Sequence, residues 1–323
     1  MLLMLDKKIK KLKELLKNKN IAVAFSGGVD STLLLKIAKE VSNEVIAVTV
    51  DIGAIPKNQI TEAKKIAREI GVKHKIIKEN FLEYEWFQHE KYRCYFCKKR
   101  MYKLIKNFVG EKFEIIDGTN VTDMLEDRPG IVANYEENIK SPLVEAQISH
   151  DEAAEYLKNK NIRHLKDTTC LATRVKKGKL TKNKIKRINK AENIVKKFFA
   201  GNIRVRDLDG IAVIEAEKFN IDEKILEKLC KSLKKLGFKK VLLDIEGYKK
   251  KYNIKQKNNE LIVTLPYQIN LKDCKERYVI KKGKIYLDSG VVILSKNGKI
   301  HVKSNNPTNT LFKVLSCIRR DSI

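Results

Sequence analysis

The stretch that decides the fold is Ile-Ala-Val-Ala-Phe-Ser-Gly-Gly-Val-Asp-Ser, residues 21 to 31. Its first five residues form a continuous apolar run, which is typical of a strand buried on both faces of a parallel sheet. The run stops at Ser26, and a helical pattern begins at Asp30. A strand that turns through small residues straight into a helix directs several backbone N–H groups at one point, so we expect this corner to bind phosphate.

The residues of the turn suit a polyphosphate. Gly27 and Gly28 let the backbone approach the anion without a Cβ in the way, and the hydroxyls of Ser26 and Ser31 can donate hydrogen bonds to it. Asp30 can hold a magnesium ion that shields the phosphate charge. The turn is neither a Walker loop, which needs Gly-Lys-Ser/Thr, nor a dinucleotide fingerprint, which needs a third glycine. The alternative is an ordinary strand–turn–helix corner without a ligand.

Apolar strands alternate with helical stretches through the first half of the chain. Further strands are expected at residues 45–50, 75–78 and 113–117. This alternation predicts an α/β fold, with a parallel sheet, right-handed crossovers and helices on both faces. Ligands of such sheets bind beyond the carboxyl ends of the strands, where Ser26 and Asp51 both lie. Asp51 therefore either approaches an adenosine or is a solvated strand end.

The second half of the chain predicts two further units. Ser149 and Glu152 form a capping box that opens a helix, and a later β-β-α-β order predicts a small α+β unit. The last part is basic and carries no chemical motif, and its short strands are expected to turn at Gly283, Gly290 and Gly298. We expect three domains, namely 1–165 for the nucleotide, 166–249 for substrate or oligomerisation, and 250–323 as a β-rich extension of unknown role.

Composition narrows the class of protein. The 323 residues are enough for two or three domains. No apolar run reaches the roughly 18 residues of a membrane span, and the first residues make a poor secretory signal. Six cysteines without a dense framework fit a reducing compartment, so we expect a cytoplasmic protein without a membrane partner. The formal charge of +28 favours a polyanionic partner such as RNA, or else reflects a general lysine bias.

Three cysteines are candidates for chemistry. Residues 82–110 are expected to be helical and contain Cys94-Tyr95-Phe96-Cys97, in which two sulfurs are within reach of one metal or of each other. Cys170 lies in a polar loop. Of the others, Cys230 lies on the apolar side of an expected helix and is assigned to the core, and the last two, Cys274 and Cys317, have no assigned role.

The order of these motifs resembles the LarE-type ATP-dependent sulfur transferases, a family of the PP-loop ATP pyrophosphatase superfamily. The resemblance covers residues 8 to about 247, and we know no counterpart for the last 75 or so. The stretches that carry it are Ser26 to Ser31, Arg93 to Lys98, Asp117 to Asn120, Arg128 to Gly130, Ser141 to Ala146, Cys170 to Arg174 and Arg204 to Arg206.

Departures from the family pattern fall on the substrate side of the motifs. The family's Lys-Pro before the central cysteine is Lys166-Asp167 here, and its Tyr-Gly pair is Lys177-Gly178. The residue before Ile214-Glu215 is usually Arg, and here it is Val213. These differences concern the acceptor molecule more than the ATP chemistry.

The resemblance implies an enzyme with an adenine-nucleotide alpha hydrolase-like sheet that acts as a homo-oligomer. Such enzymes adenylate an acceptor carboxylate with ATP and Mg²⁺, release pyrophosphate and transfer sulfur to a pyridinium mononucleotide in nickel-pincer cofactor synthesis. It also implies catalytic roles for Ser26, Asp30 and Cys170. Its ATP-binding positions correspond to Ser26, Gly27, Gly28, Asp30, Ser31, Asp51, Gly118 and Asn120.

Members of the family obtain the transferred sulfur in one of two ways. Cys170 either gives up its own sulfur, or joins Cys94 and Cys97 in binding a 4Fe-4S cluster that accepts sulfide or another sulfur donor. Zinc held by the three cysteines and a histidine, such as His89 or His164, is an alternative. A redox disulfide between Cys94 and Cys97 is another.

The substrate phosphate has candidate ligands in a strand. Arg204 and Arg206 alternate, so both side chains leave the same face, and two guanidinium groups suit the phosphate of a mononucleotide. Arg174 can help to hold that phosphate or AMP. The alternative is a solvated strand face.

Two other functions remain open. A tRNA thiolation enzyme would use the same adenylation step on a base carbonyl, and the +28 charge favours it. A non-catalytic nucleotide- or RNA-binding protein could also retain the loop, although the complete Ser26–Ser31 motif and the three cysteines argue against this.

Overall fold

The computed structural model describes residues 2–165, 170–218, 222–248 and 254–320. Its first part is built on a four-stranded sheet of order β3-β2-β1-β4, in which every neighbouring pair is parallel. The strands are β1 (Asn20–Ala24), β2 (Glu44–Asp51), β3 (Lys73–Lys78) and β4 (Glu114–Ile116). The α/β sheet predicted from the alternating pattern is thus confirmed.

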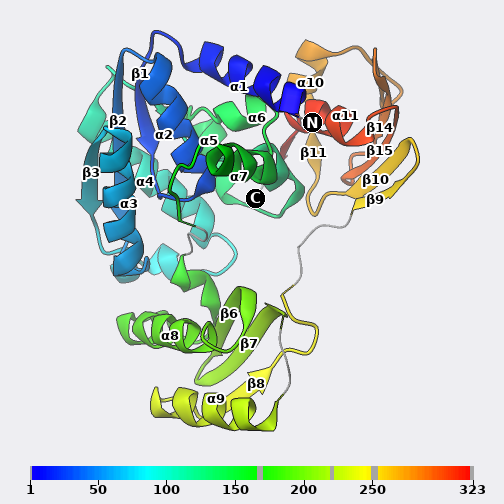
Figure 1. Cartoon of the computed structure of the whole chain (residues 1–323). Helices are drawn as coiled ribbons and strands as arrows, with labels where there is room; N and C mark the ends of the chain where they lie inside the picture. Colours follow the sequence, from blue (N-terminus) through cyan, green and yellow to red (C-terminus); the bar gives the residue numbers. More distant parts are fainter. Residues whose placement is uncertain (1, 166–169, 219–221, 249–253, 321–323) are drawn as a thin grey trace.

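Helices cover both faces of this sheet (Figure 1). In the described residues, no helix combines the length and the apolar composition that a membrane crossing requires. The helices of this part are α1 (Leu2–Leu16), α2 (Val29–Val41), α3 (Lys57–Ile70), α4 (Arg93–Val109), α5 (Gly130–Glu136), α6 (Pro142–Glu145) and α7 (His150–Asn159).

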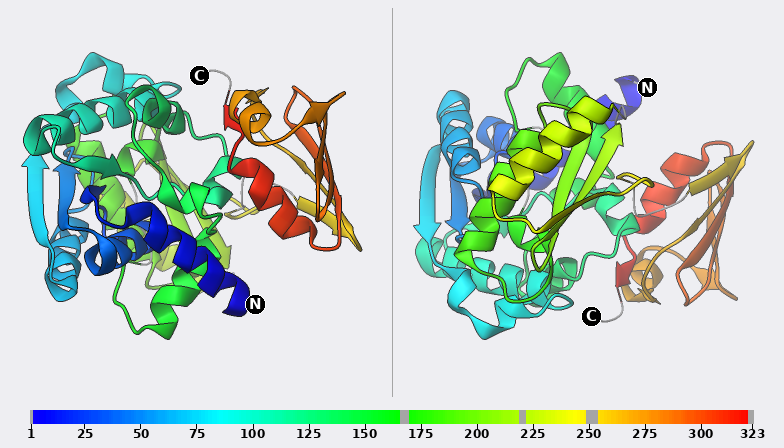
Figure 2. Two further views of the ribbon diagram at one scale, coloured as in Figure 1. Left: turned by 90° about the horizontal axis from the view of Figure 1, so that it is seen from above. Right: turned by 90° about the horizontal axis from the view of Figure 1, so that it is seen from below.

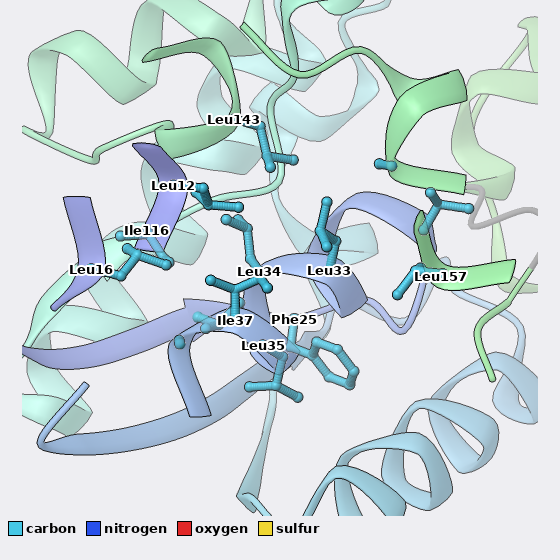
Figure 3. Close-up of a cluster of buried hydrophobic side chains, with 14 of the residues drawn as sticks. Leu12, Leu16, Phe25, Leu33, Leu34, Leu35, Ile37, Ile116, Leu143 and Leu157 are labelled. Carbon is cyan, nitrogen blue, oxygen red and sulfur yellow. The ribbon is translucent and has the colours of Figure 1, made fainter. Parts of the chain in front are cut away.

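Alternate residues of β1 enter different cores. Ile21 and Val23 join the core formed with α1, α2, α3 and α7, whereas Ala22 belongs to the core formed with α4 and α5 on the other face. Figure 3 shows Leu33 and Leu34 of α2 in the first of these cores. Because side chains alternate across a strand, a run that is apolar at every position can bury both faces, and this explains the unbroken apolar sequence before Ser26.

The expected helix over 82–110 is wrong in its first third. Phe81–Glu83 (η1) and Glu85–Gln88 (η2) are 3₁₀ turns, and the helix α4 begins only at Arg93. Phe81 packs edge-on against Trp86 with ring centroids 5.4 Å apart. Tertiary packing of the aromatic rings therefore overrides the local helical pattern. The predicted capping box is confirmed, since Glu152 N donates to Ser149 Oγ and Ser149 N donates to the Glu152 carboxylate.

A small mixed sheet of order β5-β6-β7-β8 follows, with its own apolar core. Its β6-β7-α9-β8 segment has the predicted β-β-α-β order. In α9 the buried side chains are Leu229 and Leu233, while Cys230 is only partly buried, so its expected core position is wrong. The elements are η4 (Leu171–Arg174), β5 (Val175–Lys177), α8 (Lys182–Val195), β6 (Ala200–Leu208), β7 (Ile211–Lys218), α9 (Glu223–Lys235) and β8 (Lys240–Leu243).

The C-terminal region forms an antiparallel sheet of order β12-β13-β14-β15-β10-β9 beside the first part (Figures 1 and 2). The sequence predicts turns at Gly283, Gly290 and Gly298: Gly283 and Gly298 lie in turns, and Gly290 begins β14 directly after one. All three have positive φ. Its elements are β9 (Ile254–Lys257), β10 (Glu260–Thr264), β11 (Ile269–Asn270), α10 (Lys272–Arg277), β12 (Ile280–Lys281), β13 (Lys284–Leu287), β14 (Gly290–Leu294), β15 (Lys299–Ser304), α11 (Pro307–Leu315) and β16 (Arg319–Arg320).

Two features of this region were not predicted. Helices α10 and α11 interrupt the strands, and α11 begins with the Asn306 side chain capping Asn309 N. A disulfide joins Cys274 of α10 to Cys317, just after α11. Both cysteines belong to a core that also includes Val121 and Leu125 of the first part. The extension is therefore packed onto the α/β unit through a shared apolar core.

Candidate active site

The turn after β1 folds back over the start of α2. Ser26 Oγ lies 3.1 Å from Ser31 Oγ, and Ser31 Oγ donates to the Gly28 carbonyl at 3.2 Å. Gly28 N donates to Ser26 Oγ at 3.3 Å. Because the residue that precedes α2 is a glycine, no side chain caps this helix end. The N–H groups of the first helical turn therefore face the position that an anion would take.

Glycine is required at two positions beside this turn. Gly27 has a φ of +78°, and a Cβ added to it would lie 3.0 Å from Ala63 Cα and 3.2 Å from Leu165 Cδ1. Gly118 follows β4, and a Cβ there would lie 3.1 Å from Ser31 N. Only a backbone without side chains allows these segments to approach so closely. The structure thus brings together two of the glycines expected at the nucleotide, although they are about ninety residues apart.

Asp30 in the first turn of α2 has one oxygen paired and one buried without a partner. His150 Nδ1 lies 3.0 Å from Asp30 Oδ2, and Asp30 Oδ1 has no hydrogen-bond partner among the described residues. The hydrogen bond to Asp30 raises the pKa of His150. A buried carboxylate oxygen without a partner costs free energy that a bound cation would recover. Carboxylate chemistry and this free oxygen both fit the expected magnesium ion.

A second acidic group lies near Asp30. Asp123 forms an ion pair with Arg128 at 2.9 Å. The pKa of Asp123 is raised to about 6, mainly because the side chain is buried. The charge of Arg128 lowers this pKa, and the charge of Asp30 raises it. Two acidic side chains thus lie near the nucleotide loop, each with a basic partner, and Asp30 Oδ1 is the oxygen left for a divalent cation.

Asp117 at the end of β4 connects the sheet to the helix that carries Cys94 and Cys97. Its carboxylate accepts hydrogen bonds from Lys98 Nζ at 2.6 Å and from Ser141 Oγ at 2.8 Å. Burial alone would raise the pKa of Asp117, but the charge of Lys98 and the surrounding hydrogen bonds lower it below its usual range. The ionised carboxylate thus fixes the Lys98 side chain of α4 against the edge of the sheet where the nucleotide is expected.

The other two expected nucleotide ligands have structural partners. Asp51 Oδ1 accepts from Gly53 N at 3.1 Å, just beyond β2. Asn120 Oδ1 accepts from the N–H groups of Thr122 and Asp123, and this caps the 3₁₀ turn η3 (Val121–Leu125). Asn120 therefore fixes the direction of the chain after Gly118.

The three candidate cysteines are free thiols in one neighbourhood. Cys94 is exposed, whereas Cys97 is buried and packs in the same core as the partly buried Cys170. Burial raises the pKa of Cys97, and the charges of Cys170 and Cys94 raise it further. Burial also raises the pKa of Cys170 to about 11. Because Cys94 and Cys170 both act on Cys97, the three sulfurs lie within electrostatic range, although Cys94 and Cys170 are 76 residues apart along the chain.

The thiols do not form a preassembled metal site. Within the described ranges, no three His, Cys, Asp or Glu side chains are arranged to hold one metal ion. The alternative disulfide between Cys94 and Cys97 is not formed, since both thiols are free. His164, one histidine considered for zinc, has its Nδ1 3.2 Å from the Ile162 carbonyl.

Arg93 holds the cysteine segments together. Its buried guanidinium donates to the Ala172 carbonyl at 2.7 Å and to the Phe87 carbonyl at 2.6 Å. Ala172 lies two residues after Cys170, and Arg93 immediately precedes Cys94. Leu171 N donates to the Ala54 carbonyl at 3.0 Å, beyond the end of β2. These bonds anchor the Cys170 loop at the same edge of the sheet as the nucleotide loop.

Two of the three arginines expected at the substrate phosphate donate to Thr173. Arg174 Nη1 donates to Thr173 Oγ1 at 2.7 Å, and Arg206 Nη1 donates to the Thr173 carbonyl at 3.2 Å. Arg206 also makes a two-bond pair with Glu215 at 2.7 and 2.8 Å. Arg204 lies over the ring of Tyr248, 5.0 Å from its centroid.

Arg174 has an unused donor. It is 3% exposed and pairs with Glu192 at 2.8 Å, and its Nη2 is buried without a partner in the part of the chain that the structure describes. A polar cleft of about 40 Å³ beside it is lined by residues that include Asn58 of α3, Glu192 of α8 and Arg204 of β6. The cleft therefore lies between the α/β unit and the small sheet, next to the Cys170 loop.

Four residues of this site received no role from the sequence, namely Arg93, Lys98, Asp117 and His150. Three of them lie inside the motifs already singled out, which was the available signal. His150 carried no signal beyond its place at the start of a capped helix, because its partner Asp30 lies 120 residues away. Lys166 to Thr168, where the sequence departs from the family pattern, lie outside the described residues.

Comparisons with known proteins agree with this geometry. A family model described as queuosine biosynthesis protein QueC matches residues 20–88. An uncharacterized protein of Methanocaldococcus jannaschii is 34% identical over 245 residues, which are 74% of this chain and 94% of that protein. An uncharacterized protein of Synechocystis is 30% identical over 258 residues, with 76% and 96% covered.

A third relative has a named activity. The pyridinium-3,5-bisthiocarboxylic acid mononucleotide synthase of Lactiplantibacillus plantarum is 27% identical over 242 residues, which are 71% of this chain and 87% of that protein. The matches span the nucleotide loop, the parallel sheet and most of the length of these relatives. The chain therefore belongs to the PP-loop ATP pyrophosphatases of the LarE type.

Proposed function

We propose that this protein adenylates a carboxylate with ATP and replaces one of its oxygens by sulfur, and that its acceptor is a pyridinium mononucleotide of nickel-pincer cofactor synthesis. The proposal depends on one observation above all. The nucleotide loop follows β1, and the Cys170 loop is bonded beyond β2 through Leu171 N and the Ala54 carbonyl. Activation and sulfur delivery can therefore take place at one edge of the sheet.

The first step needs a grip on the phosphates that leave. The carboxylate oxygen of the acceptor attacks the α-phosphorus of ATP, an acyl adenylate forms, and pyrophosphate departs. The Ser26 and Ser31 hydroxyls and the N–H groups at the start of α2 would hold the departing phosphates. The buried oxygen of Asp30 would hold Mg²⁺, which neutralises charge on them.

The second step needs a sulfur nucleophile. It attacks the carbonyl carbon of the adenylate, AMP departs with the bonding electrons, and a thiocarboxylate remains. Three cysteines are the ligands that iron–sulfur clusters use, and a 4Fe-4S cluster held by Cys94, Cys97 and Cys170 would supply a sulfide carrier. Because the pKa of Cys170 is raised, its thiol is protonated at neutral pH. This proton would have to leave when the sulfur binds iron. Loss of sulfur from Cys170 itself is the other route.

The acceptor would be recognised by its phosphate. Arg174 has a buried donor without a partner in the described chain, and Arg204 lines the adjacent cleft. Arg206, through its bond to the Thr173 carbonyl, would orient the loop that carries Arg174. A guanidinium donor with no partner is a reason to expect an anion there.

Anaerobic reconstitution with iron, sulfide, ATP and a carboxylated pyridinium mononucleotide tests the proposal. We expect pyrophosphate release that depends on the mononucleotide, and an acceptor heavier by the exchange of oxygen for sulfur in mass spectrometry. Cys170→Ser should abolish sulfur transfer but leave pyrophosphate release, whereas Cys230→Ser, in α9, should change neither. Full sulfur transfer by a variant without Cys94, Cys97 and Cys170 would refute the role of the thiols. The mass of Cys170 after turnover separates the two sulfur sources.

A second candidate is tRNA thiolation, which the +28 charge favours. Pyrophosphate release that is stimulated by tRNA and not by the mononucleotide would establish it. The three-domain division, a homo-oligomer and a cytoplasmic location also belong to this proposal, although the Cys274–Cys317 disulfide is a kind of bond that is rare in the cytosol. Light scattering would measure the number of subunits.

A further inference from the structure

The six-stranded C-terminal sheet has one face in the core and one face open. Leu261, Val292 and Val302 are buried in the core shared with the α/β unit. Figures 1 and 2 show α10 and α11 on the inner side of this sheet, between it and the rest of the molecule. Because side chains alternate across a strand, the residues between the buried ones point to the outer side.

The strand register aligns these outward residues in two rows. Antiparallel partners lie on the same face, so the pairing carries each row from strand to strand. The first row runs Tyr286, Val291, Lys303, Glu260 and Lys257. The second row runs Lys284, Ile293, His301, Ile262 and Lys255. With strands about 4.8 Å apart, each row extends about 19 Å.

The rows have a basic border and a central strip that includes branched apolar side chains. Lys255, Lys257 and Lys284 stand at the ends of the rows and are exposed. In the centre, Lys303 is exposed and pairs with Glu260 at 2.8 Å. The central side chains Ile262, Val291 and Ile293 are half-buried. Tyr286 is 59% exposed. An aromatic ring that stands out of a lysine-framed sheet presents a stacking surface next to cations.

The C-terminal region has fewer acidic residues to balance its basic ones than the rest of the chain has. Residues 254–320 contain fourteen Lys and Arg and four Asp and Glu, which leaves 54 and 36 for the other 256 residues. Basic residues therefore outnumber acidic ones by more than three to one here and by only three to two elsewhere. The difference comes from fewer acidic residues, because Lys and Arg make up about the same share of both parts.

We infer that the outer face of the C-terminal sheet binds single-stranded nucleic acid, with the border lysines on the phosphates and Tyr286 against a base. Stacking on an exposed ring and contacts to phosphates are the two elements of single-strand binding that tolerates many sequences. Ile262 and Ile293 are half-buried, so they offer little apolar surface to a lipid layer, which favours nucleic acid over a membrane. The site is independent of the proposed sulfur transfer.

Fluorescence anisotropy of the full chain with a labelled uridine dodecamer and its DNA counterpart tests the inference. We expect the logarithm of affinity to fall linearly with the logarithm of salt concentration. A triple variant Lys255→Gln, Lys257→Gln and Lys284→Gln should reduce that slope by about 2, because each lost phosphate contact removes about 0.7. The matched control changes Lys224, Lys228 and Lys231 of α9 to Gln, with the same loss of charge, and should keep the slope.

The aromatic contact has its own test. Tyr286→Ala should weaken binding about tenfold, while Tyr286→Phe keeps the ring and should bind as the parent does. Thermal unfolding confirms that each variant is folded. The inference would be overturned if both lysine triples lowered the salt slope equally, or if Tyr286→Ala left the affinity unchanged. Absence of binding at about 50 mM salt would also overturn it. Binding to anionic vesicles or to a poly-glutamate peptide with the same dependence on Tyr286 would also overturn it.

Discussion

The two large sheets of this protein solve the same burial problem differently. In the parallel sheet both faces are covered, so β1 sends Ile21 and Val23 into one core and Ala22 into another. In the antiparallel sheet only one face is covered, so β15 sends Ile300 and Val302 inward and lysines outward. The first arrangement leaves the strand ends open to a ligand. The second leaves a whole face, and what that face binds depends on its composition.

The largest expected effect of a single substitution is at Gly27 in the parallel sheet. Gly27→Ala must adopt a φ of +78° and place a Cβ 3.0 Å from Ala63 Cα. We expect ATP-dependent pyrophosphate release to fall about 100-fold or more, because displacement of the loop moves several phosphate donors together. A pyrophosphate assay and a thermal melt measure the two consequences.

Gly71 is the matched control for Gly27. It has the same φ of +78° after α3, but nothing lies within 4 Å of an added Cβ. In Gly71→Ala, the left-handed conformation should therefore lower the free energy of unfolding by only about 1–2 kcal/mol. Activity should be kept. Equal losses of activity in the two variants would mean that the close approach at Gly27 does not matter.

The second-largest effect is expected at Leu311, in the core that joins the C-terminal region to the α/β unit. Leu311 of α11 is fully buried in the core that includes Val121 and Leu125 of η3. Leu311→Ala should cost about 2–5 kcal/mol of unfolding free energy, and it should also weaken ATP binding, since η3 directly follows Asn120. Calorimetry and nucleotide titration measure both.

The open face of the same sheet supplies the contrast. Tyr286→Ala, on the exposed side, should change stability by less than about 0.5 kcal/mol. Two well-separated unfolding transitions, with ATP binding unchanged in Leu311→Ala, would show that the C-terminal sheet is only attached to the α/β unit.

The disulfide between α10 and the end of α11 gives the third effect. Cys274 and Cys317 are 43 residues apart, and closing a loop of this length stabilises a fold by about 2–4 kcal/mol. In a double Cys274→Ala, Cys317→Ala variant, the free energy of unfolding should fall by that amount, and the melting temperature should fall with it. Parent protein treated with reductant should behave in the same way, and Cys230→Ala should not. If peptide mapping finds both thiols free in the purified parent, the bond does not contribute.

Local signals in the sequence predicted much of the nucleotide half. The Ser149–Glu152 capping box and the glycines of the loop act through neighbours a few residues away, and these predictions needed no tertiary contact. Helix α11 also had a local signal, Asn306-Pro307, a capping residue followed by proline at the first helical position. It was missed because the surrounding pattern indicated strands.

Contacts between distant residues could not be predicted in this way. Arg93 reaches the Ala172 carbonyl across 79 residues, and His150 reaches Asp30 across 120. Nothing in either local pattern specifies the partner. The two rows of the C-terminal sheet could not be predicted either. That Tyr286 and Lys257 lie on the same surface follows only from the register of five strands, which the sequence does not show.

The smallest expected effect lies under the nucleotide loop, at His74 of β3. Thr49 Oγ1 donates to the Phe25 carbonyl at 2.6 Å, so it accepts from His74 Nε2 at 2.8 Å, and His74 Nδ1 is a buried atom without a partner among the described residues. Protonation would place an N–H where no acceptor exists. Burial accordingly lowers the pKa of His74 to about 4, with a smaller contribution from Lys64.

The sign of the pH dependence follows from this pKa. The unfolded chain takes up the proton near pH 6.5 and the folded chain near pH 4, so stability falls as pH falls through that window. With allowance for partial exposure, His74 should contribute a loss of about 1 kcal/mol between pH 7 and 5. His74→Gln keeps a donor for Thr49 and should flatten the melting temperature between these pH values, whereas His89→Gln, at an exposed position, should leave the slope of the parent. An identical slope in all three proteins would mean that His74 is solvated in the folded state, and that the sheet below Ser26 is less tightly closed than its apolar sequence indicates.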